Sequence, residues 1–295
     1  MKLLKNYMNL KKFCCIFVLL ITGSQFFTSC KNTSSPEQNA FDSICSSLKF
    51  KSYKTLSENT IPPIILVYNS TLHQDEIKIS EGIVRLLIGY SWAVNDKPEY
   101  AIAESIIIKD LAKNDKDVKI LLHSLSAIAL YEKKLNTLAD EESKNAIDFI
   151  NKTPDDNSTE IKKVCYHLLL GTLCVYEQNI QGARFHFAAF NTITKIEWPY
   201  LLADALADIH ENNATKGLKK IKLLSKDKSI PKDVRNSLTE SLKKNEGKTK
   251  DIDITLFWTK TISQSVYNSI KTSNIKSIEK VSELIENIKN KLSLP

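Results

Sequence analysis

The feature that most constrains the fold of this chain is one glycine inside an apolar, helix-like pattern. Gly171 follows three leucines in the run HLLLGTLCVYEQNIQGARFHFAAFNTI, residues 167–193, and the chain has only seven glycines among 295 residues. A glycine within a helix costs on the order of 1 kcal/mol relative to alanine, so it usually marks a place where a neighbour packs too closely for a side chain. We therefore expect a second helix to pack tightly against Gly171.

The shortage of turn-forming residues favours an all-α fold. Eight prolines accompany the seven glycines, 42% of the residues are hydrophobic, and no run alternates between apolar and polar residues as a surface strand would. The segment IPPIILVYNS, from Ile61, fits either a strand or a helix that starts at Pro62 and Pro63. The chain is long enough to bury a sizeable core in one or two domains.

The first residues have the pattern of an export signal. Four lysines precede an uncharged apolar run over residues 13–22, and small or polar residues follow. This run is too short for a membrane span, which needs roughly 20 apolar residues. We expect a secretory signal peptide over residues 1–29, with either Met1 or Met8 as the start.

The end of this segment, Phe27-Thr28-Ser29-Cys30, resembles a bacterial lipobox. The resemblance implies that Cys30 is lipidated and becomes the new N-terminus; the alternative is an ordinary signal peptide with an incidental Cys30. Lys31 follows the cysteine instead of an acidic residue, which implies export beyond the inner membrane, to the outer membrane or the cell surface. The polar segment 30–40 is expected to be a flexible tether that reaches at most roughly 35 Å.

The remaining cysteines do not predict a disulfide or a metal site. Cys45, Cys165 and Cys174 are odd in number. If Cys165 and Cys174 share a helix, nine residues separate them by about 13 Å along its axis. This distance exceeds the Cα separation of about 7 Å that a disulfide allows. We expect both to be small packing residues.

Residues 170–187 resemble the tetratricopeptide repeat (TPR) signature, in which Leu-Gly is followed by an alanine and then a phenylalanine. Here these positions are Leu170, Gly171, Ala183 and Phe187. The resemblance implies two antiparallel helices per repeat, with small residues where the two helices approach each other.

The same frame recurs twice more. Gly89 and Ala101 lie 82 residues earlier, and Ala205 and Gly217 lie 34 residues later, each pair twelve residues apart like Gly171 and Ala183. The residues expected to pack within repeats are therefore Gly89, Ala101, Gly171, Ala183, Phe187, Ala205 and Gly217.

Residues 117–152 fit the frame less well. Ala127 and Ala146 are the small residues of a plausible helix pair, but nineteen residues separate them, so we expect an expanded turn. The overall prediction is an all-α, TPR-like helix-turn-helix array (an α-solenoid) over residues 41–225. Amphipathic helices over residues 226–295 are expected to cap it. An irregular helical bundle is the alternative.

The resemblance also implies a concave groove that binds an extended peptide or a helix. Its lining, carried over position by position, is mostly apolar: Leu86, Tyr90, Leu168, Thr172, Tyr176, Leu202, Leu206 and Ile209. It lacks the basic residues and asparagines that hold a peptide carboxylate in the chaperone-binding members. Either the C-terminal helices cover this groove or an apolar partner binds there; we favour cover.

Charge gives little support for nucleic-acid binding. The chain has a net charge of +7, and without the four signal lysines 37 basic residues face 34 acidic ones. Residues 216–250 contain eleven lysines and one arginine against four acidic residues. This stretch is either a solvated face or a contact for anionic lipid or an acidic partner, and it has no aromatic residues to stack on bases.

No motif for catalysis, a metal or a cofactor is present. The five histidines form no HExxH pattern, although His167 and His186 fall on paired helices, and no phosphate-binding glycine loop or nucleophile motif occurs. We therefore expect no enzymatic activity and no cofactor. The predicted function is a membrane-anchored envelope lipoprotein that acts as a protein interaction scaffold. The alternative is a helical envelope enzyme or ligand-binding protein with its site in the groove.

Overall fold

The computed structural model describes residues 35–73, 78–149, 152–154, 157–247 and 252–293. These residues form helices and their connections, without a strand, so the described part of the chain is all-α as predicted. No helix among them is long and apolar enough to cross a bilayer. The expected signal peptide and Cys30 lie outside the described residues. The chain divides into two units at Asn39, and nearly all the described helices belong to the second unit, Ala40–Pro295.

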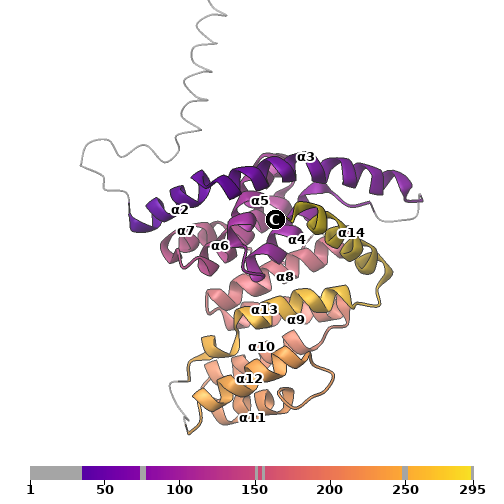
Figure 1. The fold of residues 1–295 in the computed structure, drawn as a ribbon. Helices are drawn as coiled ribbons and strands as arrows, with labels where there is room; N and C mark the ends of the chain where they lie inside the picture. The colour runs from indigo at the N-terminus through magenta and orange to yellow at the C-terminus, as the bar shows by residue number, and fades with distance from the viewer. Residues whose placement is uncertain (1–34, 74–77, 150–151, 155–156, 248–251, 294–295) are drawn as a thin grey trace, which may run out of the picture. The chain divides into compact units, whose positions relative to one another are not determined.

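Two helices open the described chain, four helix pairs follow, and three helices end it (Figure 1). The opening helices are α2 (Pro36–Ser46) and α3 (Leu48–Thr71). The pairs are α4 (Glu81–Val94) with α5 (Pro98–Leu111), α6 (Lys116–Glu132) with α7 (Asn136–Ile147), α8 (Glu160–Tyr176) with α9 (Ile180–Thr194), and α10 (Trp198–His210) with α11 (Ala214–Leu224). The last helices are α12 (Lys232–Lys244), α13 (Lys260–Lys271) and α14 (Lys276–Leu292). Short 3-10 turns lie at η1 (Ala112–Asn114) and η2 (Ile254–Phe257).

Polar side chains fix where the first helix of three pairs begins. Ser80 caps α4, Asp115 caps α6 and Thr159 caps α8, each accepting a hydrogen bond from backbone N–H groups in the first turn. Such caps satisfy donors that have no partner inside the helix and typically contribute about 1 kcal/mol. The local sequence therefore determines these helix starts.

The turn inside each helix pair has the same backbone geometry. One residue per turn has a positive φ, between 55° and 64°: Asp96, Lys134, Gln178 and Asn212. The next residue donates its N–H to the carbonyl five positions back, in the pairs Lys97–Trp92, Leu135–Leu130, Asn179–Cys174 and Asn213–Asp208. This left-handed residue with a six-to-one hydrogen bond is the Schellman arrangement, which satisfies carbonyls at a helix end. All four pairs therefore reverse direction in the same way.

The shared turn corrects the expected register of the second pair. The small residues seven positions before each left-handed residue are Gly89, Ala127, Gly171 and Ala205. Twelve residues after Ala127 comes Ala139, which is fully buried, so the expected expanded turn between Ala127 and Ala146 is wrong. Ala139 and Ala146 are seven residues apart and both are buried on one face of α7, so alanine spacing alone could not distinguish them.

Two other expectations about local structure need correction. Pro62 and Pro63 lie inside the 24-residue helix α3, so they neither belong to a strand nor start a helix. Packing of Phe50, Tyr53 and Ile61 in the core outweighs the two backbone hydrogen bonds that the prolines remove. Helix α2 begins at Pro36, so the segment expected to be a tether over residues 30–40 is helical from residue 36.

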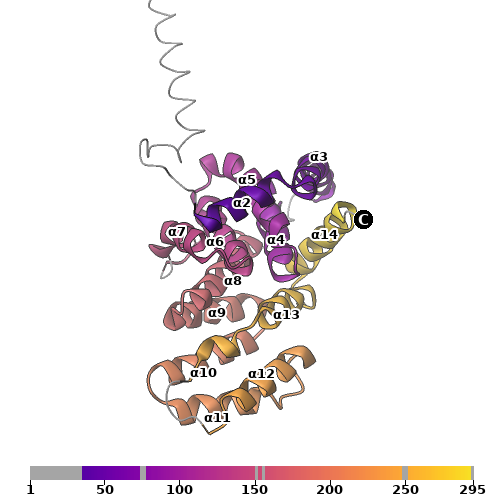
Figure 2. The same cartoon turned by 60° about the vertical axis from the view of Figure 1, so that its left-hand side comes forward.

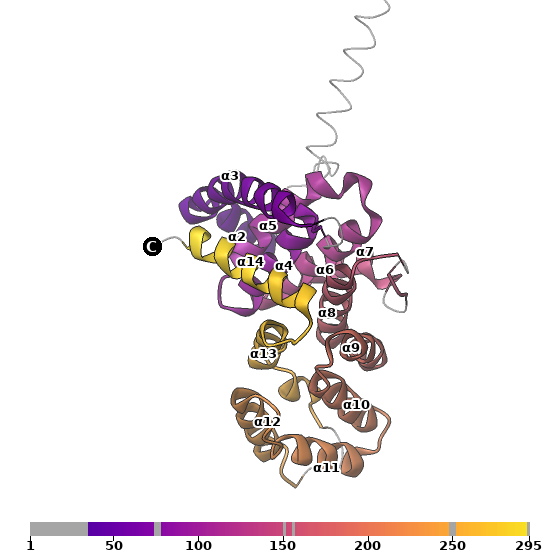
Figure 3. The same cartoon turned by 90° about the vertical axis from the view of Figure 1, so that its right-hand side faces the viewer.

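The C-terminal helices return along the array (Figures 2 and 3). Helix α13 packs against α4 and α12, and α14 packs against α3, α4 and α8. Their buried side chains join those of the four pairs in one continuous hydrophobic core. Residues 252–292 therefore contribute to the core of this unit.

Candidate functional site

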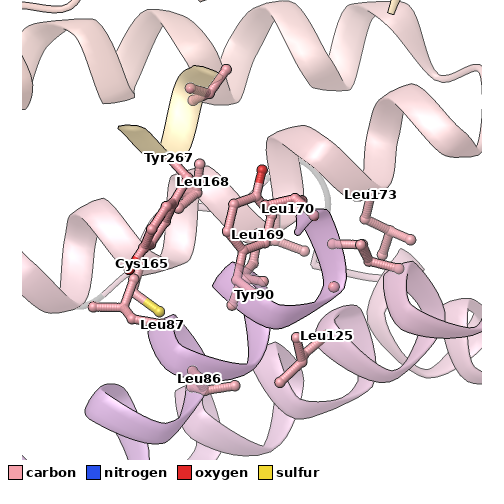
Figure 4. Close-up of a cluster of buried hydrophobic side chains, with 14 of the residues drawn as sticks. Leu86, Leu87, Tyr90, Leu125, Cys165, Leu168, Leu169, Leu170, Leu173 and Tyr267 are labelled. Carbon is pink, nitrogen blue, oxygen red and sulfur yellow. The ribbon is translucent and has the colours of Figure 1, made fainter. Parts of the chain in front are cut away.

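The predicted groove residues of α4 and α8 lie beneath the C-terminal helices, whereas Ile209 of α10 packs against Gly217 of α11. Seven of the eight are buried, and Tyr176 is half-buried. Figure 4 shows Leu86 and Tyr90 of α4, Leu168 of α8 and Tyr267 of α13 in one apolar cluster. The surface that these side chains share is thus in contact with residues 257–292, which we call the lid.

Tyr90 connects the lid to two helix pairs. Its hydroxyl lies 3.0 Å from Thr172 Oγ1 of α8 and donates to the carbonyl of Ser263 in α13 at 3.4 Å. Its ring lies 6.1 Å from that of Tyr267. Burial raises the pKa of Tyr90 well above its usual range, so the hydroxyl stays protonated as a hydrogen-bond donor.

Polar contacts hold the first turns of α13. Lys260 Nζ lies 2.5 Å from Asp96, in the turn that joins α4 to α5, and 3.5 Å from Glu132 at the end of α6. Gln264 donates to the side chain of Asn95 at 2.5 Å. These contacts are partly exposed, so they orient the helix more than they stabilise it.

Helix α14 places a lysine against aromatic rings. Lys289 Nζ lies 5.2 Å from the ring centre of Trp92 and 5.5 Å from that of Tyr267, and 3.3 Å from Glu286. Its side chain is 13% exposed. Burial lowers the pKa of Lys289, while Glu286 and the electron-rich ring faces favour the charged form. The charge fixes the end of α14 over α4.

Two of the seven residues expected to pack between paired helices do so closely, whereas a Cβ atom at Gly89 would lie 2.5 Å from Leu125 of α6, in the next pair. All seven are buried. A Cβ atom at Gly171 would lie 3.0 Å from Phe187 Cζ and 3.3 Å from His186 Cβ, both on α9. A Cβ atom at Gly217 would lie 2.5 Å from the carbonyl oxygen of Ala205 on α10. Helices in both pairs therefore approach each other where a side chain would not fit.

A buried polar network joins α3 to the first pair. Arg85 is 1% exposed and Glu104 is fully buried; their side chains pair at 2.8 Å, and Arg85 also reaches Ser57 at 2.8 Å and Glu81 at 2.6 Å. Tyr53 donates to the same carboxylate at 2.8 Å. Burial raises the pKa of Glu104, and Arg85 acts against this shift. No sequence motif predicts this network; its one signal is an arginine within the apolar run of residues 83–94.

The histidines on paired helices meet in the core. His167 and His186 are buried, and their Nδ1 atoms lie 3.0 Å apart. Burial, with a smaller contribution from Lys163, lowers the pKa of His167 to about 4. No group of three or more potential metal ligands occurs among the described residues. Burial therefore keeps His167 neutral near pH 7, beside the ring of His186.

The remaining cysteines are reduced packing residues. Cys165 and Cys174 are buried and Cys45 is half-buried, all as free thiols. Burial raises the pKa of Cys174 to about 12, which leaves almost no reactive thiolate near neutral pH.

Part of the basic stretch 216–250 is neutralised by α10. Lys216 pairs with Asp208 at 2.7 Å, and Lys220 pairs with Asp208 at 2.6 Å and with Asp204. The two carboxylates thus bind α11 to α10 and reduce the positive charge that the stretch presents to solvent.

A separate cavity of about 690 Å³ lies where α4, α6 and α8 begin. Its charged lining residues are Lys78, Asp115, Lys116, Asp117 and Lys162. Lys162 lies 2.9 Å from Asp117 and 3.4 Å from Asp115, so its charge is already paired. This cavity does not include the predicted groove residues.

Comparisons with protein-family models, curated proteins and solved structures found no match to this chain. The described residues thus define an all-helical protein with adjacent helices packed in pairs and a C-terminal lid, and its function must be inferred from this geometry.

Proposed function

We propose that this chain is a cell-envelope lipoprotein, anchored through Cys30, and that its helices form a TPR-like repeat array that serves as a protein interaction scaffold. The observation that carries the proposal is the turn shared by the four helix pairs. Four successive pairs with the same Schellman turn, and small residues at the same two positions, are the geometry of a repeat.

The packing between paired helices supports the same proposal. Gly217 of α11 lies against the backbone of Ala205 of α10, and Gly171 of α8 lies against Phe187 of α9. Ala205 and Gly217 are the two small positions of one repeat, and Gly171 and Phe187 are the glycine and phenylalanine positions of another. Such close contacts restrict how the paired helices can pack against each other.

The lid indicates where a partner binds. Leu168, Leu202 and Leu206 are buried, so the groove is occupied by the chain itself. The second helix of each pair, in contrast, exposes one large hydrophobic side chain: Leu111, Ile147, Phe185 and Leu223. Within the proposal, the groove residues hold the lid, and the protein partner contacts the outer face of α5, α7, α9 and α11.

A photo-crosslinking experiment in the native envelope tests this assignment. A photoreactive phenylalanine analogue replaces Phe185, which is 40% exposed on α9, or Tyr176, which is half-buried beside the groove. We expect a discrete protein adduct from position 185 and none from position 176. Adducts only from position 176 would assign the partner to the groove, and adducts from neither would contradict the scaffold. The same experiment with Cys30→Ala tests whether the partner requires the anchor.

A further inference from the structure

Helix α3 exposes an unusual amount of apolar surface. Leu48 is 80% exposed, Leu66 is 72% exposed and Val67 is 61% exposed; of the large hydrophobic residues in the described chain, only Leu223 is comparable, at 63%. Leu48 and Leu66 are eighteen residues apart, which is five helical turns, so both point to the same side. The opposite side of α3 is buried against α5 and α14.

The exposed side of α3 has few charges between its two ends. Ser52, Thr55, Asn59 and Pro63 lie between Leu48 and Leu66 and are exposed, and the ion pair Lys54–Glu58 lies beside them on an adjoining face. Lys49 and Lys51 are exposed near the start of the helix. In a chain with 25% charged residues, a helix face in water usually carries charges along its length. This side of α3 instead has exposed apolar residues at both ends and lysines near its start.

The chain length before α3 restricts what this side can face. Residues 31–35 extend over at most about 18 Å, and the four helical residues 36–39 add about 6 Å. A lipid on Cys30 therefore holds Ala40 within about 25 Å of the membrane surface. Within the unit from Ala40, α3 lies at one end and α11 with α12 at the other (Figures 1 and 3).

We propose that the outer side of α3 rests on the phospholipid surface, with Leu48, Leu66 and Val67 among the headgroups and Lys49 and Lys51 beside lipid phosphates. This inference rests on the proposed anchor at Cys30. The described part of the basic stretch 216–250 belongs to α11, α12 and their connections, at the end of the unit opposite α3 (Figures 1 and 3).

The test measures which end of the unit touches lipid. Mature protein that begins at Cys30 and carries Cys45→Ser is coupled through Cys30 to a maleimide phospholipid, because Cys165 and Cys174 are buried and unreactive. The vesicles contain brominated phosphatidylcholine, which quenches nearby tryptophan, and a minority of phosphatidylglycerol. Leu66→Trp is compared with Leu223→Trp, a similarly exposed leucine on α11. The three native tryptophans are buried and supply the baseline in unsubstituted protein.

We expect Leu66→Trp to lose most of its added emission in brominated vesicles and Leu223→Trp to keep it. Quenching of Leu223→Trp, or of both variants equally, would overturn the proposal. So would an unquenched Leu66→Trp whose emission shifts to the blue with increasing protein concentration, because a second copy of the chain would then cover α3. Mass measurement of the natively expressed protein tests lipidation separately, so failure of the anchor is distinguishable from failure of the α3 contact.

Discussion

The ring of Trp258 stacks on the ring of Phe187, with 4.8 Å between their centres and 25° between their planes. The same ring packs against Gly171 of α8, so the lid contacts α9 where it meets α8. Trp258 Nε1 donates to Ser263 Oγ at 3.1 Å, which links this stack to the first turn of α13. One aromatic pair therefore couples the lid to a helix pair.

Trp258→Ala is expected to destabilise the lid and the array together. Loss of a buried tryptophan typically costs about 3–5 kcal/mol of unfolding free energy. We expect one shared transition in urea at a lower midpoint, with increased binding of a hydrophobic dye below it. Trp258→Phe retains a ring on Phe187 and is expected to lose less. A lid that melts in a separate transition, with the array unaffected, would contradict this coupling.

Gly217→Ala is expected to cost more than Gly171→Ala. An alanine Cβ at position 217 would meet the backbone oxygen of Ala205 at 2.5 Å, whereas at position 171 it would meet the edge of the Phe187 ring at 3.0 Å. A ring can shift by a few tenths of an ångström more easily than a helix backbone. At either site the higher helix propensity of alanine stabilises the folded variant by about 1 kcal/mol. We therefore expect a loss of about 1–3 kcal/mol for Gly217→Ala and a near-neutral Gly171→Ala in urea unfolding. Equal losses of unfolding free energy in the two variants would contradict this prediction, because the backbone contact would then yield as easily as the ring.

Arg85→Met is expected to be strongly destabilising near neutral pH, by about 3–5 kcal/mol, because Glu104 then lacks its buried counterion. Burial already raises the pKa of Glu104, so its carboxyl becomes protonated as the pH falls and part of the lost stability should return. The double variant Arg85→Met/Glu104→Gln should lose less than the two single variants together. The exposed pair Lys54–Glu58 supplies the control: Glu58→Gln should change stability by less than about 1 kcal/mol.

His167 is expected to weaken the fold in mild acid. Its folded pKa is about 4, below the ordinary value of 6.5, so between these values the unfolded chain binds a proton that the folded chain does not. Stability from this residue is therefore complete above about pH 6.5 and decreases toward pH 4, by up to about 1.4 kcal/mol per pH unit. His167→Asn keeps a polar partner for His186 and should flatten this part of the stability profile. Parallel profiles for the two proteins would contradict the assignment.

Cys30→Ala tests the anchor directly. If Cys30 is lipidated, the variant should leave the membrane fraction or retain its first 29 residues, with a change in electrophoretic mobility. Detergent-phase partitioning and intact mass measure both effects. Identical partitioning and mobility for variant and unsubstituted protein would remove the basis for a lipid anchor.

The all-helical class could be predicted because the scarcity of glycine and proline excludes many turns. The helix starts at Ser80, Asp115 and Thr159 were not predicted, although each residue is a local cap before an apolar helical pattern. The twelve-residue spacing from Gly171 to Ala183 also reflects a local property, the length of one helix-turn-helix unit.

The remaining features depend on contacts between distant residues. Arg85, Ser57 and Glu104 come from three helices, and no sequence pattern indicated that they meet. The apolar faces of α13 and α14 indicate that one side of each helix is buried. They do not indicate that Tyr90 contacts α13 or that Trp92 contacts α14. The helix through Pro62 and Pro63 persists because tertiary packing outweighs intrinsic propensity.

The shared turn also shows where this chain can accept extra sequence. Three residues separate the helices of every pair, while the connections between pairs vary, and the longest, residues 148–159, joins α7 to α8. A fluorescent reporter or an affinity epitope grafted into residues 148–159 should leave every helix pair intact, whereas the same graft at Asp96, Lys134, Gln178 or Asn212 would destroy a turn that tolerates no change in length.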